Sequence, residues 1–338
     1  MNRITLIGLG FVGGSMGMAL RSALAGKTEV VGYDADPKVH NEARKLGSVD
    51  RSEWALDDAV RDSDIVVVAV PATSVRDVFE AIAPHLKPGA IVTDTTATKR
   101  VVQAWADELL PSETAFVGGN PLIGTGLSGS KAATPAVFQG AKYCVVAAPL
   151  APQEAVGAVV RMTEDIGSKA MFIDKDEHDS FMAAMTGLPT VVSAALMLAV
   201  AKSPSWRELN QFSKSEFTEL TKLASADPAV THGLFDTNSD MMVHWLDEMI
   251  DQLTQLKSFA QDAAGLEPQG PLANAMVAAW EARARMEAGV NQSETLREPL
   301  PTASDGIMNM VMGSAAAKLF RQNKKVKDPN TYDRSKIN

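Results

Sequence analysis

Short apolar runs alternate with amphipathic stretches along the first half of the chain. These runs cover residues 4–7, 30–33, 64–70, 90–94, 115–117, 143–146 and 170–173. Between them, residues 38–46 and 74–83 have apolar positions at helical spacing. The uninterrupted β-branched run at residues 64–70 is typical of a central strand in a parallel sheet. The pattern therefore predicts an α/β fold with a doubly wound parallel sheet.

From about residue 176 onward the periodicity is helical. The predicted helices cover residues 177–201, 214–225, 236–264, 272–287 and 306–320. We expect Pro189 to kink or interrupt the first of them. The sequence thus predicts three parts: an α/β domain at 1–175, an all-α domain at 176–290, and a C-terminal loop, helix and basic tail at 291–338. We expect the tail to be mobile; a partner-binding arm is the alternative.

The longest apolar run, residues 191–201, is typical of a helix buried on all sides. It is far shorter than the ~20 residues of a membrane span. Such a helix is buried either within one subunit or against a second copy of the chain. We favour the second, which predicts a homodimer through the helical domain.

Composition and charge limit the classes of protein to which the chain can belong. The chain has 338 residues, of which 46% are hydrophobic and 22% charged, and its net charge is −9. This indicates a soluble globular protein and argues against binding to nucleic acid or an anionic membrane. Because the first apolar run is only strand-length, we expect no signal peptide and a cytoplasmic location. The single cysteine, Cys144, is predicted to be buried, and the five histidines show no metal-ligand spacing.

A glycine pattern follows the first predicted strand, at Gly8, Gly10 and Gly13. This spacing permits a tight turn, a close approach of the backbone to a pyrophosphate, and close packing of the next helix on the strand. The helix N-terminus adds free N–H groups and a positive dipole end. The context predicts a Rossmann-type dinucleotide site in which Phe11 and Val12 also contact the cofactor.

The second predicted strand ends in Asp34, at the distance expected for a residue that binds the adenosine ribose. A carboxylate there accepts hydrogen bonds from the ribose hydroxyls and repels a 2′-phosphate, so we expect NAD rather than NADP. Ligands of such sheets lie beyond the carboxyl ends of the strands. We therefore expect Val70, Pro71 and Thr95 to contact the cofactor as well.

Several stretches, taken in order, resemble the prephenate and arogenate dehydrogenases of tyrosine biosynthesis. They are Gly8–Ser15, residues 30–34, 68–71, 91–99, 116–125 and 128–129, His178-Asp179, Leu188-Pro189 and residues 223–228. The resemblance implies NAD(P)-dependent oxidative decarboxylation of a cyclohexadienyl acid. It also implies a Rossmann domain followed by a helical dimerisation domain, and a small carboxylate as substrate.

The chain departs from this family mainly where the chemistry takes place. The family's histidine after the glycines of the fifth strand is Asn120 here, and its serine after the fourth strand is Ala97. Two further histidines are replaced by Gly187 and Thr190, and the substrate-binding arginine by Lys222. The cofactor half of the family pattern is kept, whereas the catalytic half is changed.

Three explanations fit the missing histidine base. Aromatisation of the ring drives the reaction with water as proton acceptor, or the substrate carries an amino group, or the substrate is a different acid. A catalytically silent NAD-binding protein is a further alternative.

As catalytic candidates the sequence offers Asn120, Thr96, Lys99 and Lys222. Lys99 and Lys222 are cations that can pair with a carboxylate. For His178 we favour helix capping or packing over catalysis.

Overall fold

The structure is a computed structural model, which describes residues 3–124, 129–226, 228–262, 267 and 269–289. It contains two compact units, with the boundary after Leu246. The predicted helix at 306–320 and the tail at 321–338 lie outside the described residues. The domain boundary that we place at residue 175 stays a prediction.

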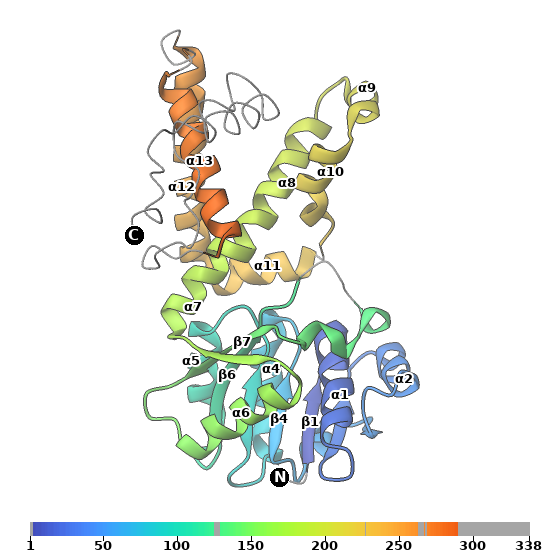
Figure 1. Ribbon diagram of the computed structural model, residues 1–338. Helices are drawn as coiled ribbons and strands as arrows, with labels where there is room; N and C mark the ends of the chain where they lie inside the picture. Colours follow the sequence, from blue (N-terminus) through green and yellow to red (C-terminus); the bar gives the residue numbers. More distant parts are fainter. Residues whose placement is uncertain (1–2, 125–128, 227, 263–266, 268, 290–338) are drawn as a thin grey trace, which may run out of the picture. The chain divides into compact units, whose positions relative to one another are not determined.

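Eight strands form one sheet in the order β3-β2-β1-β4-β5-β6-β7-β8. Figure 1 labels β1, β4, β6 and β7 among them. The strands are β1 (Arg3–Ile7), β2 (Glu29–Tyr33), β3 (Arg51–Ser52), β4 (Ile65–Val68), β5 (Ile91–Asp94), β6 (Ala115–Pro121), β7 (Lys142–Ala147) and β8 (Lys169–Phe172). The first six are parallel, with β1 at the point where the winding reverses. The predicted doubly wound sheet is confirmed for these strands.

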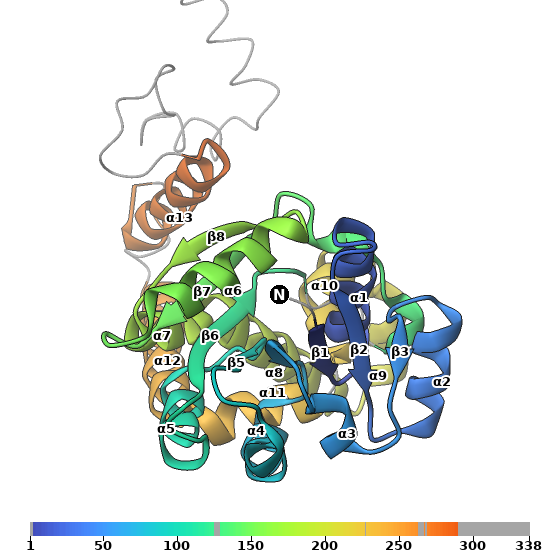
Figure 2. The ribbon, with the colours of Figure 1, turned by 90° about the horizontal axis from the view of Figure 1, so that it is seen from below.

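Helices cover both faces of the sheet (Figure 2). They are α1 (Phe11–Ala23), α2 (Pro37–Lys45), α3 (Leu56–Val60), α4 (Ala72–Ile82), α5 (Arg100–Leu109) and α6 (Gln153–Asp165). The central strand β4 contributes to two cores, because successive side chains of a strand point to opposite faces. Its Ile65 and Val67 pack with residues of α1 and α6. Its Val66 and Val68 pack with residues of α4 and α5.

The sheet is not parallel throughout, which corrects the prediction for one strand pair. Strands β6 and β7 are antiparallel, with Asn120 opposite Cys144. A parallel return requires a crossover, usually an α-helix. In the part of the connection that the structure describes, only two short 3₁₀ segments occur, η2 (Ser130–Ala132) and η3 (Pro135–Phe138). The chain therefore returns alongside β6 in the opposite direction.

The helical part begins directly after β8. Its helices are α7 (Lys175–Met182), α8 (Leu188–Ala201), α9 (Trp206–Leu209), α10 (Ser215–Thr221), α11 (Pro228–Thr237), α12 (Ser239–Gln261) and α13 (Pro271–Glu287). A π-helical turn, η4 (Ala183–Gly187), joins α7 to α8. Pro189 lies in the first turn of α8, directly after this turn. Because proline lacks an N–H, the wider π turn accommodates it without ending the helix.

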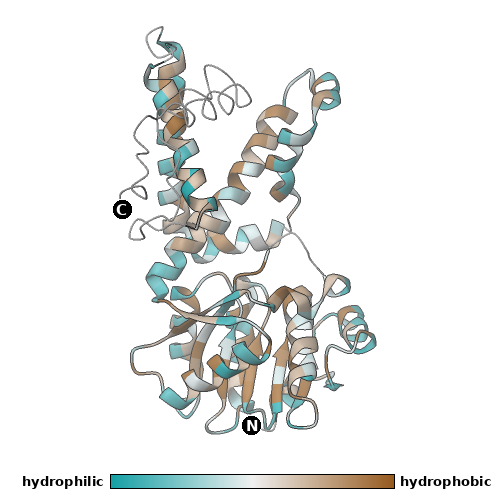
Figure 3. Cartoon of the chain, in the orientation of Figure 1, coloured by the Kyte–Doolittle hydropathy of each residue, from teal (hydrophilic) through white to brown (hydrophobic). Residues whose placement is uncertain are grey.

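Helix α8 is not buried on all sides within this subunit, as expected if a second copy of the chain covers it. Of its fourteen residues only Ser193 is buried, and Leu198 is 58% exposed. Figure 3 shows apolar colouring along α8. The continuous stretch Lys175–Ala201 is long and apolar enough, by length and composition, to cross a membrane, with 28% of its most apolar window buried. Burial within this subunit therefore does not account for its apolar character.

Gly187, one of the positions that departs from the family pattern, packs directly against a buried methionine. A Cβ atom at this position would overlap the sulfur of Met242 on α12, which is completely buried. A histidine could not occupy this position without displacing Met242.

We predict that Gly187→Ala destabilises the protein, although alanine normally stabilises a helix by ~1 kcal/mol relative to glycine. Overpacking against Met242 should cost about 1–3 kcal/mol. Thermal unfolding followed by circular dichroism measures the change. Gly157→Ala in α6 is the matched control, because its Cβ would meet only the flexible end of Arg161. That variant should unfold at an equal or higher temperature. An equally stable Gly187→Ala would contradict the packing argument.

Candidate active site

The three glycines after β1 have different structural roles. Gly8 has φ +92°, and a Cβ there would lie 2.5 Å from the carbonyl oxygen of Ala69. A Cβ at Gly13 would overlap the carbonyl oxygen of Gly8, whereas one at Gly10 would have no atom within 4 Å. Gly8 and Gly13 thus hold the turn and the helix against the strands, while Gly10 leaves the backbone open to a ligand. This is the arrangement that a pyrophosphate requires.

Asp34 lies beside this loop at the end of β2. Its Oδ2 accepts a hydrogen bond from the Leu9 N–H at 2.7 Å, and its Oδ1 accepts one from the Asp36 N–H at 2.9 Å. The backbone thereby holds the carboxylate at the edge of the glycine loop. A second carboxylate, Asp36, caps α2 through the Lys38 N–H at 2.8 Å. Two negative charges at this position fit NAD and disfavour a 2′-phosphate.

The other expected cofactor residues lie around the same edge of the sheet. Phe11 and Val12 begin α1, whose N-terminus has no side-chain cap. Val70 and Pro71 follow β4, and Thr95 follows β5, where its N–H donates to the Val68 carbonyl at 3.2 Å. Their contact with the cofactor stays a prediction.

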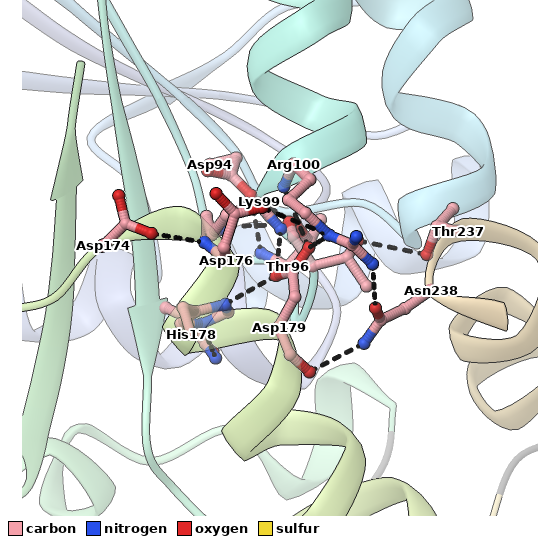
Figure 4. A network of polar contacts seen from close by, with 12 residues as sticks. Asp94, Thr96, Lys99, Arg100, Asp174, Asp176, His178, Asp179, Thr237 and Asn238 are labelled. Carbon is pink, nitrogen blue, oxygen red and sulfur yellow. Dashed lines mark hydrogen bonds and ion pairs between the residues drawn. The ribbon is translucent and has the colours of Figure 1, made fainter. Parts of the chain in front are cut away.

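Lys99, proposed as a cation for the site, is 1% exposed and has its charge already paired. Its Nζ donates to Asp94 Oδ2, and Thr96 Oγ1 lies 3.1 Å from the same Nζ (Figure 4). Burial lowers the pKa of the Lys99 ammonium, and the Asp94 carboxylate opposes that shift. Asp94 Oδ1 also accepts the Gly119 N–H at 3.1 Å. The geometry pairs Lys99 and Thr96 with Asp94, which in turn joins β5 to β6. A direct contact of Lys99 or Thr96 with the substrate stays a prediction.

Asp179 on α7 is completely buried and receives four hydrogen bonds. Oδ1 accepts the Lys99 N–H at 2.6 Å and Nδ1 of His178 at 2.9 Å. Oδ2 accepts the Arg100 N–H at 2.9 Å and Arg100 Nε at 3.4 Å. Lys99 is the N-cap residue of α5 and Arg100 its first residue, and the helix has no side-chain cap of its own. Asp179 therefore supplies that cap from another element.

Arg100 connects the same carboxylate to α12. Its guanidinium donates to Asp240 at 2.8 and 2.5 Å and to Oδ1 of Asn238 at 2.9 Å. Asn238 in turn donates to the backbone carbonyl of Asp179 at 2.8 Å. The start of α5 is therefore fixed to both α7 and the start of α12 (Figure 4).

Asn120, at the position of the family's histidine, contacts a different histidine. Its Nδ2 lies 3.0 Å from Nε2 of His178, and both side chains are buried. Burial lowers the pKa of His178; the hydrogen bond to Asp179 opposes this, and the positive charge of Lys99 adds to it. Packing, which we favoured for His178, is only part of its role, because the ring joins Asp179 to Asn120.

Lys222, the fourth catalytic candidate, lies apart from this cluster. It begins η6 (Lys222–Ser225), a short segment held on α8 by a hydrogen bond from the Ala224 N–H to Oγ of Ser193 at 2.9 Å. Its side chain is exposed. Its role in binding substrate stays a prediction.

Two buried carboxylates, Asp94 and Asp179, were not among the residues predicted from sequence. Each had a signal. Asp94 ends an apolar strand and Asp179 follows His178 in one of the family stretches. A charged residue within a buried element is rarely unpaired. The hydrogen-bond partners of Asp94 and Asp179, however, could not be predicted from the spacing of residues along the chain.

Comparisons with known proteins identify both parts of the chain. Residues 16–172 match the family described as "Prephenate dehydrogenase, nucleotide-binding domain", and residues 174–267 match "Prephenate dehydrogenase, dimerization domain". The prephenate dehydrogenase of Bacillus subtilis is 27% identical over 76% of this chain and 70% of its own length. The cyclohexadienyl dehydrogenase of Zymomonas mobilis is 28% identical over 75% of this chain and 87% of its own length.

Solved structures show the same fold. The prephenate dehydrogenase from A. aeolicus, in complex with hydroxyphenyl propionate and NAD+, matches with a TM-score of 0.77 at 24% identity. The match covers 85% of this chain and 98% of that one. Synechocystis arogenate dehydrogenase matches with a TM-score of 0.64 at 24% identity, over 77% of this chain and 92% of that one.

We predict that Asp179→Asn lowers the free energy of unfolding by about 3 kcal/mol, the usual cost of removing one partner from a buried charged network. The amide would present an N–H₂ group to donors that need an acceptor. Chemical denaturation measures the loss. Asp176→Asn on the same helix is the control, because Asp176 is 68% exposed and lies 3.9 Å from Arg100. Equal stability of the two variants would contradict the proposed role of Asp179.

Proposed function

Because the chain belongs to the prephenate dehydrogenase family, we propose that it catalyses the NAD-dependent oxidative decarboxylation of a cyclohexadienyl acid. The observation that carries this proposal is the arrangement of one sheet edge. The open Gly10 and Asp34 lie there, and β6 on the same sheet carries Asn120. The matches to both family domains support a substrate of the same class as those of the relatives.

The electron balance explains how an enzyme of this kind works with an asparagine in place of the family's histidine. When bound, the nicotinamide accepts a hydride from the ring carbon that carries the hydroxyl. The bond from the ring to its carboxylate breaks, its electron pair enters the ring, and CO₂ leaves. The hydroxyl of the substrate becomes the hydroxyl of the phenolic product, so it can keep its proton throughout. The protein needs to supply a hydrogen-bond acceptor at the hydroxyl, and the Asn120 carbonyl can be that acceptor.

The hydrogen bonds and the ion pair around Asn120 hold this residue in position. Asp94 holds the Gly119 N–H next to Asn120, and Lys99 neutralises Asp94. A polar group that is positioned before the reaction costs no reorganisation when charge develops in the transition state. This rigidity favours turnover through orientation rather than through a titrating base at position 120.

We further propose a homodimer formed through the helical part. The exposed apolar side chains of this part include Met185, Leu198, Phe212 and Leu220. They lie on η4, α8, η5 (Asn210–Phe212) and α10. Residues 174–267 match a family described as a dimerization domain. A second copy of the chain is therefore the occupant that we assign to this surface.

We expect the purified protein to reduce NAD in the presence of prephenate or arogenate and to release CO₂ and a phenol. Absorbance of NADH measures the rate, and calorimetry measures NAD binding independently. Turnover of either acid supports the proposal and identifies the side chain that is accepted. Tight NAD binding with no turnover of either acid would contradict the proposal and favour a different substrate or a silent relative.

For the dimer, we predict that Leu198→Glu shifts the protein to monomer, because a charge would be buried at the contact. Sedimentation velocity measures the mass in solution. Leu150→Glu provides a matched control, since Leu150 is 96% exposed on the α/β domain; that variant should stay dimeric. A wild-type monomer, or a Leu198→Glu dimer of unchanged affinity, would exclude this interface.

A further inference from the structure

We propose that Asp179, His178 and Asn120 form a hydrogen-bonded chain that turns the Asn120 carbonyl oxygen toward the substrate and makes it the acceptor for the ring hydroxyl. This inference rests on the proposed oxidative decarboxylation. Asn120 would be the catalytic residue, in contact with the substrate. His178 and Asp179 would be positioning residues, which act only through Asn120.

The direction of the chain begins at Asp179. Its two carboxylate oxygens accept the backbone N–H groups of Lys99 and Arg100, which can only donate. The N-terminus of α5 also favours the ionised form of the carboxylate. An ionised carboxylate only accepts hydrogen bonds. Nδ1 of His178, 2.9 Å from Asp179 Oδ1, must therefore carry the proton that forms this bond.

The tautomer of His178 then follows. With the proton on Nδ1, a neutral ring has a lone pair on Nε2. Burial lowers the pKa of His178, which keeps the ring neutral near pH 7. The charged groups that act on the ring come from three elements: Asp179 on its own helix, Lys99 before α5, and Asp94 at the end of β5. Because Lys99 and Asp94 pair with each other, their opposite effects on the pKa of the ring partly offset one another.

The orientation of Asn120 is the next step. A lone pair on Nε2 requires a donor, and Nδ2 of Asn120 lies 3.0 Å away. The opposite orientation of the amide would place its oxygen against that lone pair, so that two acceptors would face each other. The ring thus selects one of the two orientations, with the nitrogen toward His178 and the oxygen turned away from it.

The position of Asn120 makes it the end of the chain that a ligand can reach. The pairing of Ile91 with Ala115 places Gly118 level with Asp94, so Asn120 lies two residues further toward the carboxyl edge of the sheet. All three side chains are buried, at 0% exposure for Asp179, 1% for His178 and 4% for Asn120, so the place of Asn120 on the sheet is what separates it from the other two. Ligands of such sheets bind beyond this edge.

The chain also strengthens the acceptor. Each hydrogen bond polarises the next one, so electron density is shifted from Asp179 toward the Asn120 oxygen. As the hydride leaves, positive charge develops on the substrate hydroxyl, and this oxygen stabilises it. The hydroxyl keeps its proton, the ring–carboxylate electron pair enters the ring, and no proton is left on the protein.

Protonation of His178 would reverse the arrangement. Nε2 would become a donor, the amide would have to turn, and its N–H₂ group would face the hydroxyl. The wild-type kcat should therefore fall about tenfold for each pH unit below the pKa of His178. Because burial lowers that pKa, the fall should lie below the ordinary histidine value of about 6.5.

The test compares wild-type enzyme with His178→Gln, using NAD and whichever cyclohexadienyl acid the wild type oxidises. We expect His178→Gln to lower kcat about 10–100-fold, the usual effect of losing such a positioning partner. Its NAD affinity should be unchanged, and the acid limb of its pH profile should be absent. His85→Gln is the control, because His85 is exposed on η1 (Ala83–His85); it should keep both the rate and the acid limb.

Adding Asn120→His to His178→Gln gives a rescue test. A histidine at position 120 accepts the hydroxyl hydrogen bond itself, so the double variant should recover turnover relative to His178→Gln. A purely structural role of His178 would not be rescued by a change at a neighbouring residue. If His178→Gln does not fold, Asn120→Ala tests the chain from its other end and should lower kcat by at least as much.

The outcomes separate the two proposals. A wild-type enzyme that oxidises no cyclohexadienyl acid overturns the proposed function and this inference with it. A wild-type enzyme that is active, with His178→Gln or Asn120→Ala of unchanged kcat, overturns this inference alone. An acid limb that persists in His178→Gln does the same.

Discussion

A carboxylate with no access to water must be surrounded by donors, and this requirement at Asp179 determines how the site is built. The donors are the backbone N–H groups of Lys99 and Arg100 at the start of α5, the Arg100 side chain, and the ring of His178. Moving any of them would leave the buried carboxylate with one hydrogen bond fewer, at a cost of about 1–3 kcal/mol or more. Asp179 therefore fixes the α/β part to the start of the helical part.

The second buried charge pair fixes the neighbouring strand. Asp94 at the end of β5 binds the Lys99 ammonium and the Gly119 N–H. Lys99 thus belongs to both clusters, through its backbone to Asp179 and through its side chain to Asp94. Between the two clusters lie His178 and Asn120, whose contact depends on both α7 and β6 being held in place. This arrangement explains why a lysine with a lowered pKa can be structural rather than catalytic.

The cofactor-binding half of the protein could be predicted from sequence, because the residues that form its motifs lie close together along the chain. Gly8, Gly10 and Gly13 lie within one turn, and the apolar runs mark the strands directly. The antiparallel return of β7 was missed because the periodicity of the sequence does not report strand direction. In the described part of the connection the chain forms only short 3₁₀ segments. Likewise, His178 and Asn120 are 58 residues apart, and only the packing of α7 against β6 brings them together. The apolar run of α8 predicted burial, but an apolar run does not say whether its own chain or a second copy covers it.

The central claim is that a neutral His178, with its proton on Nδ1, orients Asn120. Nitrogen-15 NMR of the imidazole rings in the full-length protein measures this directly, with His178 assigned by the signal lost in His178→Gln. We predict an unprotonated Nε2 and a protonated Nδ1 at pH 7, with titration below the ordinary histidine pKa of about 6.5. A proton on Nε2 at pH 7, in either the neutral or the charged ring, would contradict the account.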